Sequence, residues 1–152
     1  MAEAIALASG VAGLLSLAIQ ITTISHRYIS GFKGASKAVQ SLFRELSALQ
    51  KVLIQLQDIA QNPEYEEFTV HLQASVGIAE CHQELDRIRQ KLQKRKADGA
   101  VSASLNRLTW PFVEDETQRL VEVLHRYQVT FTSSLSLDTL YASNLTAHLS
   151  NY

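Results

Sequence analysis

MAEAIALASGVAGLLSLAIQITTI, residues 1–24, decides the fold of this chain, because so apolar a stretch has to be buried in a protein core or in a lipid bilayer. It carries one charge, Glu3, and the next ionised side chain is Arg27. A helix from Ala4 to Ser25 would be about 33 Å long at about 1.5 Å per residue, close to the roughly 30 Å hydrocarbon core of a bilayer. Its length therefore permits either a core helix or a membrane-spanning helix.

The composition of this stretch leaves its environment open. Each large aliphatic side chain favours membrane insertion by only about 0.3 to 0.6 kcal/mol, and the glycine, serine, threonine and glutamine residues between them oppose it. Three interpretations fit this marginal balance: a bundle helix that stays in the core, a helix that switches between core and membrane, and a constitutive anchor. The acidic start argues against a secretory signal peptide.

The whole chain has the size of one domain, residues 1–152, which is large enough to bury a core. With 14 basic and 15 acidic residues its net charge is -1, so no overall positive field indicates nucleic-acid binding. One cysteine, Cys81, excludes an internal disulfide and suits a reducing, intracellular compartment. Two prolines and six glycines leave room for long helices.

Apolar residues recur at intervals of three and four, which predicts an all-α fold, a bundle of four to five helices with an apolar N-terminal helix. Ser36 is the expected N-cap of the second helix, and Asn62 and Pro63 end it. Asp98 and Gly99 are expected to end the third. The expected helices cover about residues 3–29, 36–61, 64–97 and 110–148.

Each helix after the first has an expected core-facing stripe. The stripe of the second comprises Leu42, Leu46, Leu49, Leu53, Leu56 and Ala60. That of the third comprises Ala74, Ile78, Cys81, Leu85, Ile88 and Leu92. That of the fourth comprises Val113, Thr117, Leu120, Leu124, Tyr127, Phe131 and Leu135, with Leu140, Leu145 and Leu149 less regularly placed.

No sequence motif indicates catalysis. The chain lacks GxxxxGK[ST], GxGxxG, HExxH, CxxC and GxSxG, and its five histidines are scattered. Cys81 and His82 are neighbours in sequence, but about 100° apart around a helix, so they would not form a nucleophile and base pair. The stripe predicts a buried, inert thiol. We therefore expect no enzymatic activity, no cofactor and no metal.

A basic cluster near the end of the third helix has two interpretations. With Glu80, Glu84 and Asp86 before it, the cluster is typical of a solvated helix face with acid–base pairs. Alternatively, it contacts anionic lipid, which would contribute about 1 kcal/mol per basic residue. Without interleaved aromatic residues it does not indicate nucleic-acid binding. The cluster comprises Arg87, Arg89, Lys91, Lys94, Arg95 and Lys96.

Four segments together carry a family resemblance. They are MAEAIALASGVAGLLSLAIQ (1–20), RYISGFKGA (27–35), SLFRELSALQKVL (41–53) and RLTWPFVEDETQRLVEVLHRYQVTF (107–131). In these segments the chain resembles the HeLo-like (HELL) N-terminal domains of fungal STAND proteins, which are NLR-type receptors, and of related fungal cell-death effectors. Such relatives carry a further module after this domain, and this chain shows none.

The resemblance implies a necroptosis-like function in fungal innate immunity and heterokaryon incompatibility. Partner-induced oligomerisation would release the first helix, which would then permeabilise the plasma membrane. Implied partners are anionic membrane lipids, further copies of the chain and an NLR-type or amyloid-signalling activator, and the resting location is the cytoplasm. The alternative is a soluble oligomerisation adaptor of an NLR-type receptor, with the first helix permanently buried. The expected membrane-inserting residues are Glu3, Ile5, Leu7, Val11, Leu14, Leu15, Leu17 and Ile19.

Overall fold

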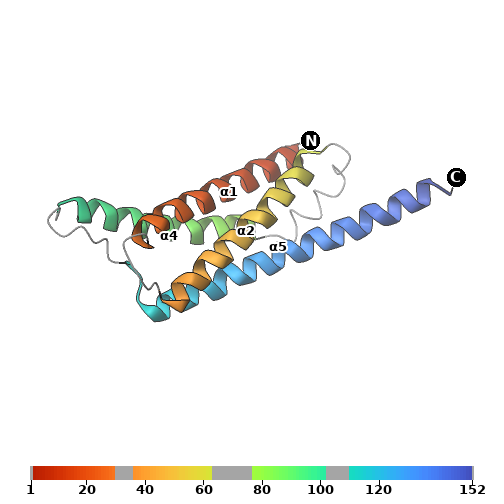
Figure 1. Ribbon diagram of the computed structural model, residues 1–152. Helices are drawn as coiled ribbons and strands as arrows, with labels where there is room; N and C mark the ends of the chain where they lie inside the picture. The colour runs from red at the N-terminus through yellow and green to blue at the C-terminus, as the bar shows by residue number, and fades with distance from the viewer. Residues whose placement is uncertain (1, 30–35, 63–76, 102–109, 152) are drawn as a thin grey trace.

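A computed structural model describes residues 2–29, 36–62, 77–101 and 110–151 (Figure 1). These residues form long α-helices and contain no strand, which confirms the all-α bundle with an apolar N-terminal helix. The helices in the described ranges are α1 (Ala2–Ile29), α2 (Lys37–Gln61), α4 (Ile78–Val101) and α5 (Glu114–Leu149).

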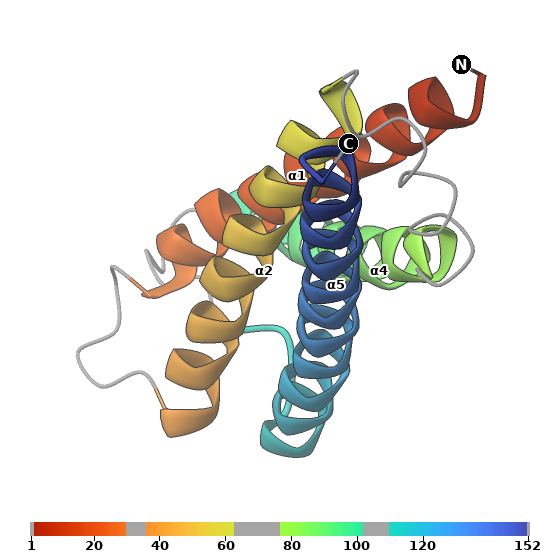
Figure 2. The ribbon, with the colours of Figure 1, turned by 90° about the vertical axis from the view of Figure 1, so that its right-hand side faces the viewer.

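The helices pack around α1 and α2. α1 contacts both α2 and α4, and α2 also contacts α5 (Figures 1 and 2). α1 and α2 run antiparallel, because Thr22 pairs with Gln50 while His26, one turn further along α1, lies against Phe43. On its other side, α2 meets α5 where Glu45 Oε1 lies 3.2 Å from Nδ1 of His125. α1 and α5 therefore lie on different sides of α2.

The core is built from the stripes that the sequence predicts. All six predicted positions of α2 are buried, and Cys81, Leu85, Ile88 and Leu92 of α4 are at most 3% exposed. In α5, Thr117, Leu120, Leu124, Phe131 and Leu135 are buried, whereas Val113 is exposed. Ala74, Leu140 and Leu145 lie outside the described side chains. The period of three and four therefore identified most of the core correctly, although Val113 and Leu149 are exposed and Ile78 and Tyr127 are only partly buried.

The ends of α2 are also as predicted. The Ser36 side chain caps the helix by accepting a hydrogen bond from the backbone N–H of Val39 at 3.3 Å. This contact satisfies one of the first-turn donors that have no partner within the helix. The helix ends at Gln61, one residue before Asn62, because proline at 63 cannot continue the hydrogen-bond ladder.

The predicted bounds of the third and fourth helices need correction. Gly77 is not helical and α4 begins at Ile78, so a continuous helix over 64–97 is wrong at this glycine, a weak helix former. Residues 63–76 lie outside the description. α4 also continues through Asp98 and Gly99 to Val101, since one glycine costs only about 1 kcal/mol in a helix.

α5 begins at Glu114 rather than at residue 110. The Trp110 and Phe112 side chains pack against the core, and the chain around Pro111 bends to place them there. The first turn of α5 carries three carboxylates, Glu114, Asp115 and Glu116, next to the positive end of the helix dipole. Here tertiary packing of two aromatic side chains outweighs the local preference for helix.

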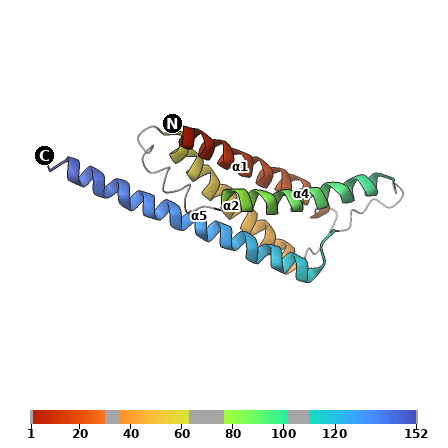
Figure 3. The same cartoon turned by 180° about the vertical axis from the view of Figure 1, so that it is seen from behind.

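The far end of α5 projects from the bundle. Toward the C-terminus the helix continues beyond the ends of α1, α2 and α4 (Figures 1 and 3). The described side chains at its end are exposed, with Leu149 71% exposed. We call residues 137–149 the distal part of α5.

Candidate functional site

The predicted membrane-inserting helix is part of the core of this fold. Leu7, Val11, Leu14 and Leu17 are at most 8% exposed, and Leu15 is partly buried against the same core. Ile19 differs, because its side chain is 48% exposed. The side chains of Glu3 and Ile5 lie outside the description.

By length and composition alone, Ala6–Tyr28 could cross a membrane, a property that core helices share. Within this segment Ser9, Ser16, Gln20 and Thr23 are exposed beside Ile19, so one face of α1 is largely polar. The buried aliphatic side chains lie on the opposite face. α1 is therefore amphipathic in the way expected of a bundle helix that packs on two neighbours.

Tyr28 fastens the C-terminal end of α1 to α4 and to the segment before α5. Its buried hydroxyl donates a hydrogen bond to the backbone oxygen of Leu92 at 2.7 Å. Its ring meets the edge of Trp110, with ring centroids 5.8 Å apart. The Trp110 indole in turn donates to Oγ1 of the buried Thr117 at 3.1 Å. Trp110 and Thr117 therefore serve as structural contacts that join three parts of the bundle.

The seam between α1 and α2 has its own polar contact. Gln50 of α2 donates to Oγ1 of Thr22 at 2.8 Å and to the backbone oxygen of Ala18 at 3.3 Å. The Thr22 hydroxyl also donates to that same Ala18 oxygen at 2.8 Å. Because the seam is partly buried, these paired groups fix the register of the two helices.

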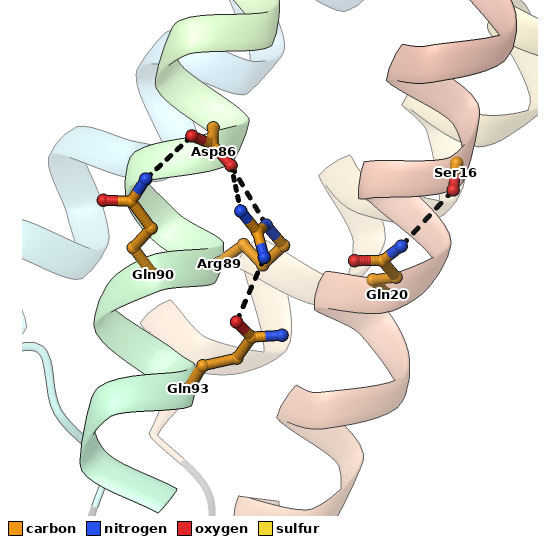
Figure 4. Close-up of polar contacts among 6 residues, drawn as sticks. All are labelled: Ser16, Gln20, Asp86, Arg89, Gln90 and Gln93. Carbon is orange, nitrogen blue, oxygen red and sulfur yellow. Dashed lines mark hydrogen bonds and ion pairs between the residues drawn. The ribbon is translucent and has the colours of Figure 1, made fainter. Parts of the chain in front are cut away.

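Most of the predicted basic cluster on α4 is ion-paired where it is described. Arg87 pairs with Glu84 at 3.2 Å, and Nε of Arg89 lies 3.0 Å from Asp86, both within α4. Figure 4 shows Arg89 between Asp86 and Gln93, on the side of α4 toward Ser16 and Gln20 of α1. This is the solvated face that the sequence suggested, while lipid contact stays an untested prediction. Lys94 is exposed, and the side chains of Arg95 and Lys96 lie outside the description.

Lys91 connects α4 to the start of α5. Its ammonium lies 2.8 Å from Oε2 of Glu116 and 4.7 Å from the ring centroid of Phe112. The Lys91 hydrogen bond lowers the pKa of Glu116 below its ordinary value. A cavity of about 310 Å³ opens beside this pair, but the charges that line it include opposite signs that already satisfy one another.

A second hollow has unpaired positive charge. It lies on the outer face of α2 beside the end of α1, with a volume of about 550 Å³. Arg44 and Lys51 are exposed there and form no ion pair with any residue in the described ranges. We call this hollow the α1–α2 groove, and its lining residues are His26, Gln40, Phe43, Arg44, Ser47, Ala48 and Lys51.

The α1–α2 groove combines aromatic and basic side chains from two helices. The rings of His26 and Phe43 lie 4.8 Å apart and tilted by 45°, and they form its apolar side. Arg44 and Lys51, two turns apart on α2, supply the charge. Sequence reasoning missed this site. Two basic residues seven apart on a polar helix face were a local signal, but nothing in the sequence placed His26 against Phe43.

The Cys81 thiol is in no position to react. It is fully buried, and desolvation raises its pKa to about 12, so the thiolate that nucleophilic chemistry requires is disfavoured. His82 is exposed, on a different side of α4, as the sequence predicts. In the described part of the chain, histidine, cysteine and carboxylate side chains form no group of three that could hold a metal ion.

Comparison with known protein families assigns the chain to a family. Residues 2–152 match the family described as the N-terminal region of the pigment biosynthesis cluster protein PigL. The chain belongs to this family. A curated relative of this PigL N-terminal domain, azaphilone pigments biosynthesis cluster protein L of Monascus ruber, is 27% identical over 136 residues. The match covers 84% of the chain and 28% of that relative, so the chain spans roughly a quarter of the relative's length. No solved structure matches.

This placement corrects the resemblance to HeLo-like domains, which is wrong. The match over residues 2–152 of the chain also overturns the cell-death function, the membrane permeabilisation and the NLR-adaptor alternative. Of the general features expected with that resemblance, the helical bundle is supported. An apolar first helix and leucine stripes are what a helical bundle needs for its core, and they did not identify the family.

Proposed function

We propose that this PigL N-terminal domain is a non-enzymatic interaction domain of a protein that serves pigment biosynthesis, and that it acts by self-association. The pigment role comes from the matched relative, whose name assigns it to an azaphilone pigment cluster. The non-enzymatic role is supported by the buried Cys81 thiol and by the structural use of Tyr28, Trp110 and Thr117.

The distal part of α5 is the observation that carries the self-association proposal. It projects from the bundle, and its sequence has Leu137, Tyr141, Leu145 and Leu149 at intervals of four, a spacing typical of a helix with one apolar side. Helices with such a pattern are stabilised by packing against a second helix. A second copy of the chain would supply a helix of the same length and with the same apolar spacing.

Charge favours a second copy over a strongly charged partner. From residue 127 to 152 the only aspartate, glutamate, lysine or arginine is Asp138, with His148 the one histidine, so two distal helices would not repel each other strongly. A highly charged partner would find little complementary charge there. In an antiparallel pair, the two Asp138 positions would lie at opposite ends of the contact, because Asp138 is near the start of the distal part.

Analytical ultracentrifugation tests self-association directly. We expect the wild-type chain to form a dimer that dissociates on dilution, and Leu145→Glu to shift it to monomer because an unpaired carboxylate is costly to bury. Ser136→Glu, on an exposed position nearer the bundle, is the matched control and should leave the dimer unchanged. A wild-type chain that stays monomeric at high concentration would refute the proposal.

The pigment role has a separate test. Deleting the gene that encodes this chain should reduce pigment in the producing organism, and re-expression of the full protein should restore it. If pigment is unchanged by the deletion, the role suggested by the relative does not apply. Restoration by a protein with Leu145→Glu would instead separate the pigment role from self-association.

A further inference from the structure

We propose that the α1–α2 groove binds a small amphipathic anion, an aromatic carboxylate in which a flat apolar body carries one acidic group. The proposal concerns another face of the molecule than the distal part of α5, and it does not depend on self-association.

The size of the groove fits a small molecule. Its volume of about 550 Å³ lies within the range of roughly 300 to 1,000 Å³ that is usual for small-molecule sites. Ser47 and Ala48, two short side chains, leave space between the longer residues on either side of them. The groove is open to solvent on its outer side, so an entering ligand would not have to displace a helix.

The aromatic side of the groove accounts for the flat apolar body. The rings of His26 and Phe43 come from different helices, and their 4.8 Å centroid separation makes one tilted aromatic surface. Phe43 is only partly buried, so some of its ring area is left for a ligand. Offset or edge-to-face packing on such rings is favourable for an aromatic ligand.

The charge of the groove accounts for the acidic group. Arg44 follows Phe43 directly, and its guanidinium can bind a carboxylate through two parallel hydrogen bonds. Lys51 adds a second positive charge at the other end of the groove. Among the described residues, no acidic side chain lines the groove, whereas glutamates line the cavity beside Lys91. The positive charges of the groove are therefore available to an anion, whereas the positive charge of Lys91 is neutralised by its ion pair.

Titration by nuclear magnetic resonance with 2-naphthoate, a simple aromatic carboxylate, tests the site. We expect dissociation constants of roughly 1 mM, the range for a small ligand at an open site. Amide shifts should concentrate at Phe43, Arg44, Ser47, Ala48 and Lys51. Neutral 2-naphthamide, which keeps the rings, and acetate, which keeps the charge, should each bind at least about fivefold more weakly if both features contribute.

Variants separate this site from general surface attraction. Arg44→Gln should weaken 2-naphthoate about tenfold or less, Lys51→Gln should have a smaller effect, and the double variant should abolish measurable binding. Arg126→Gln removes an exposed positive charge on α5 and should leave affinity unchanged. All three positions, Arg44, Lys51 and Arg126, are exposed, so the variants should fold.

Several outcomes would overturn the proposal. These are the absence of binding, equal binding of 2-naphthoate and 2-naphthamide, unchanged affinity in the double variant, or shifts that map to another face. A glutamate-rich peptide serves as the competing occupant. If the peptide shifts the groove amides and 2-naphthoate does not, the groove is a peptide site and the small-molecule proposal fails. Because ultracentrifugation reports self-association independently, failure of one proposal is distinguishable from failure of the other.

Discussion

α1 and the distal part of α5 are both poor in charge, yet the fold treats them in opposite ways. Apart from one histidine in each, Glu3 and Arg27 are the only acidic or basic residues between Ala2 and Ile29, and Asp138 is the only one in the distal part. α1 lies against α2 and α4, whereas the distal part of α5 projects past them (Figure 3). Low charge therefore indicates that a helix packs against another apolar surface. The arrangement of the neighbouring helices decides whether that surface belongs to the same chain.

The largest expected effect is a loss of stability when the covered helix is truncated in the core. Leu14→Ala should lower the free energy of unfolding by about 2 to 5 kcal/mol, because Leu14 is fully buried and its loss leaves a cavity. Leu149→Ala, at a side chain 71% exposed, should change it by less than about 0.5 kcal/mol. Urea unfolding followed by circular dichroism, at concentrations where the chain is monomeric, measures both. Equal losses of unfolding free energy in the two variants would refute the contrast between α1 and the distal part of α5.

A smaller effect is expected where α1 is fastened. Tyr28→Phe keeps the ring but removes the hydroxyl that donates to the Leu92 oxygen, which should cost about 1 kcal/mol of unfolding free energy. Tyr127→Phe is the matched control, since the Tyr127 hydroxyl has no hydrogen bond to a described residue. The same urea titrations apply. If Tyr127→Phe costs as much as Tyr28→Phe, the contact with Leu92 does not stabilise α1.

The smallest expected effect is a pH dependence at the fastened end of α5. Lys91 lowers the pKa of Glu116 in the folded state, so this pair contributes stability above the unfolded pKa and loses it as pH falls through the folded pKa. Between about pH 6 and about pH 3, the melting temperature of the wild type should therefore drop slightly more than that of Glu116→Gln. Added salt should reduce the difference, because both side chains are well exposed.

Glu114→Gln is the control for that pH measurement. Glu114 lies in the same first turn of α5 and forms no ion pair with the described residues. Its removal should leave the acid-induced drop in melting temperature as it is in the wild type. A wild type and a Glu116→Gln variant with identical pH profiles would show that the Lys91 contact does not contribute in solution.

Much of this fold could be predicted from the sequence, because the information is local. The spacing of leucines on α2 identified its buried face, and Ser36 and Asn62 marked its ends. The pairs Glu84–Arg87 and Asp86–Arg89 belong to one helix and are within reach of sequence reasoning. Properties that depend on residues three or four apart were mostly predictable, although the same spacing wrongly placed the exposed Val113 in the core.

Properties that depend on distant residues could not be predicted in this way. The contact of Lys91 with Glu116 joins two helices, and the contact of His26 with Phe43 creates the aromatic side of the groove. The start of α5 was predicted too early, because the packing of Trp110 and Phe112 decides it. The marginal insertion energy of α1 allowed both a core and a membrane, and only its neighbours place its leucines in the core.

The hydrogen bond from Tyr28 to Leu92 has a consequence for the synthesis of this protein. The two residues are 64 positions apart, so the apolar first helix is made well before its partner helix exists. At about 5 to 20 residues per second, a ribosome needs roughly 3 to 13 seconds to add that length. Of the two described helices that contact α1, only α2 is complete before α4 is made, so a chaperone that binds apolar helices could bind α1 of the nascent chain during this interval.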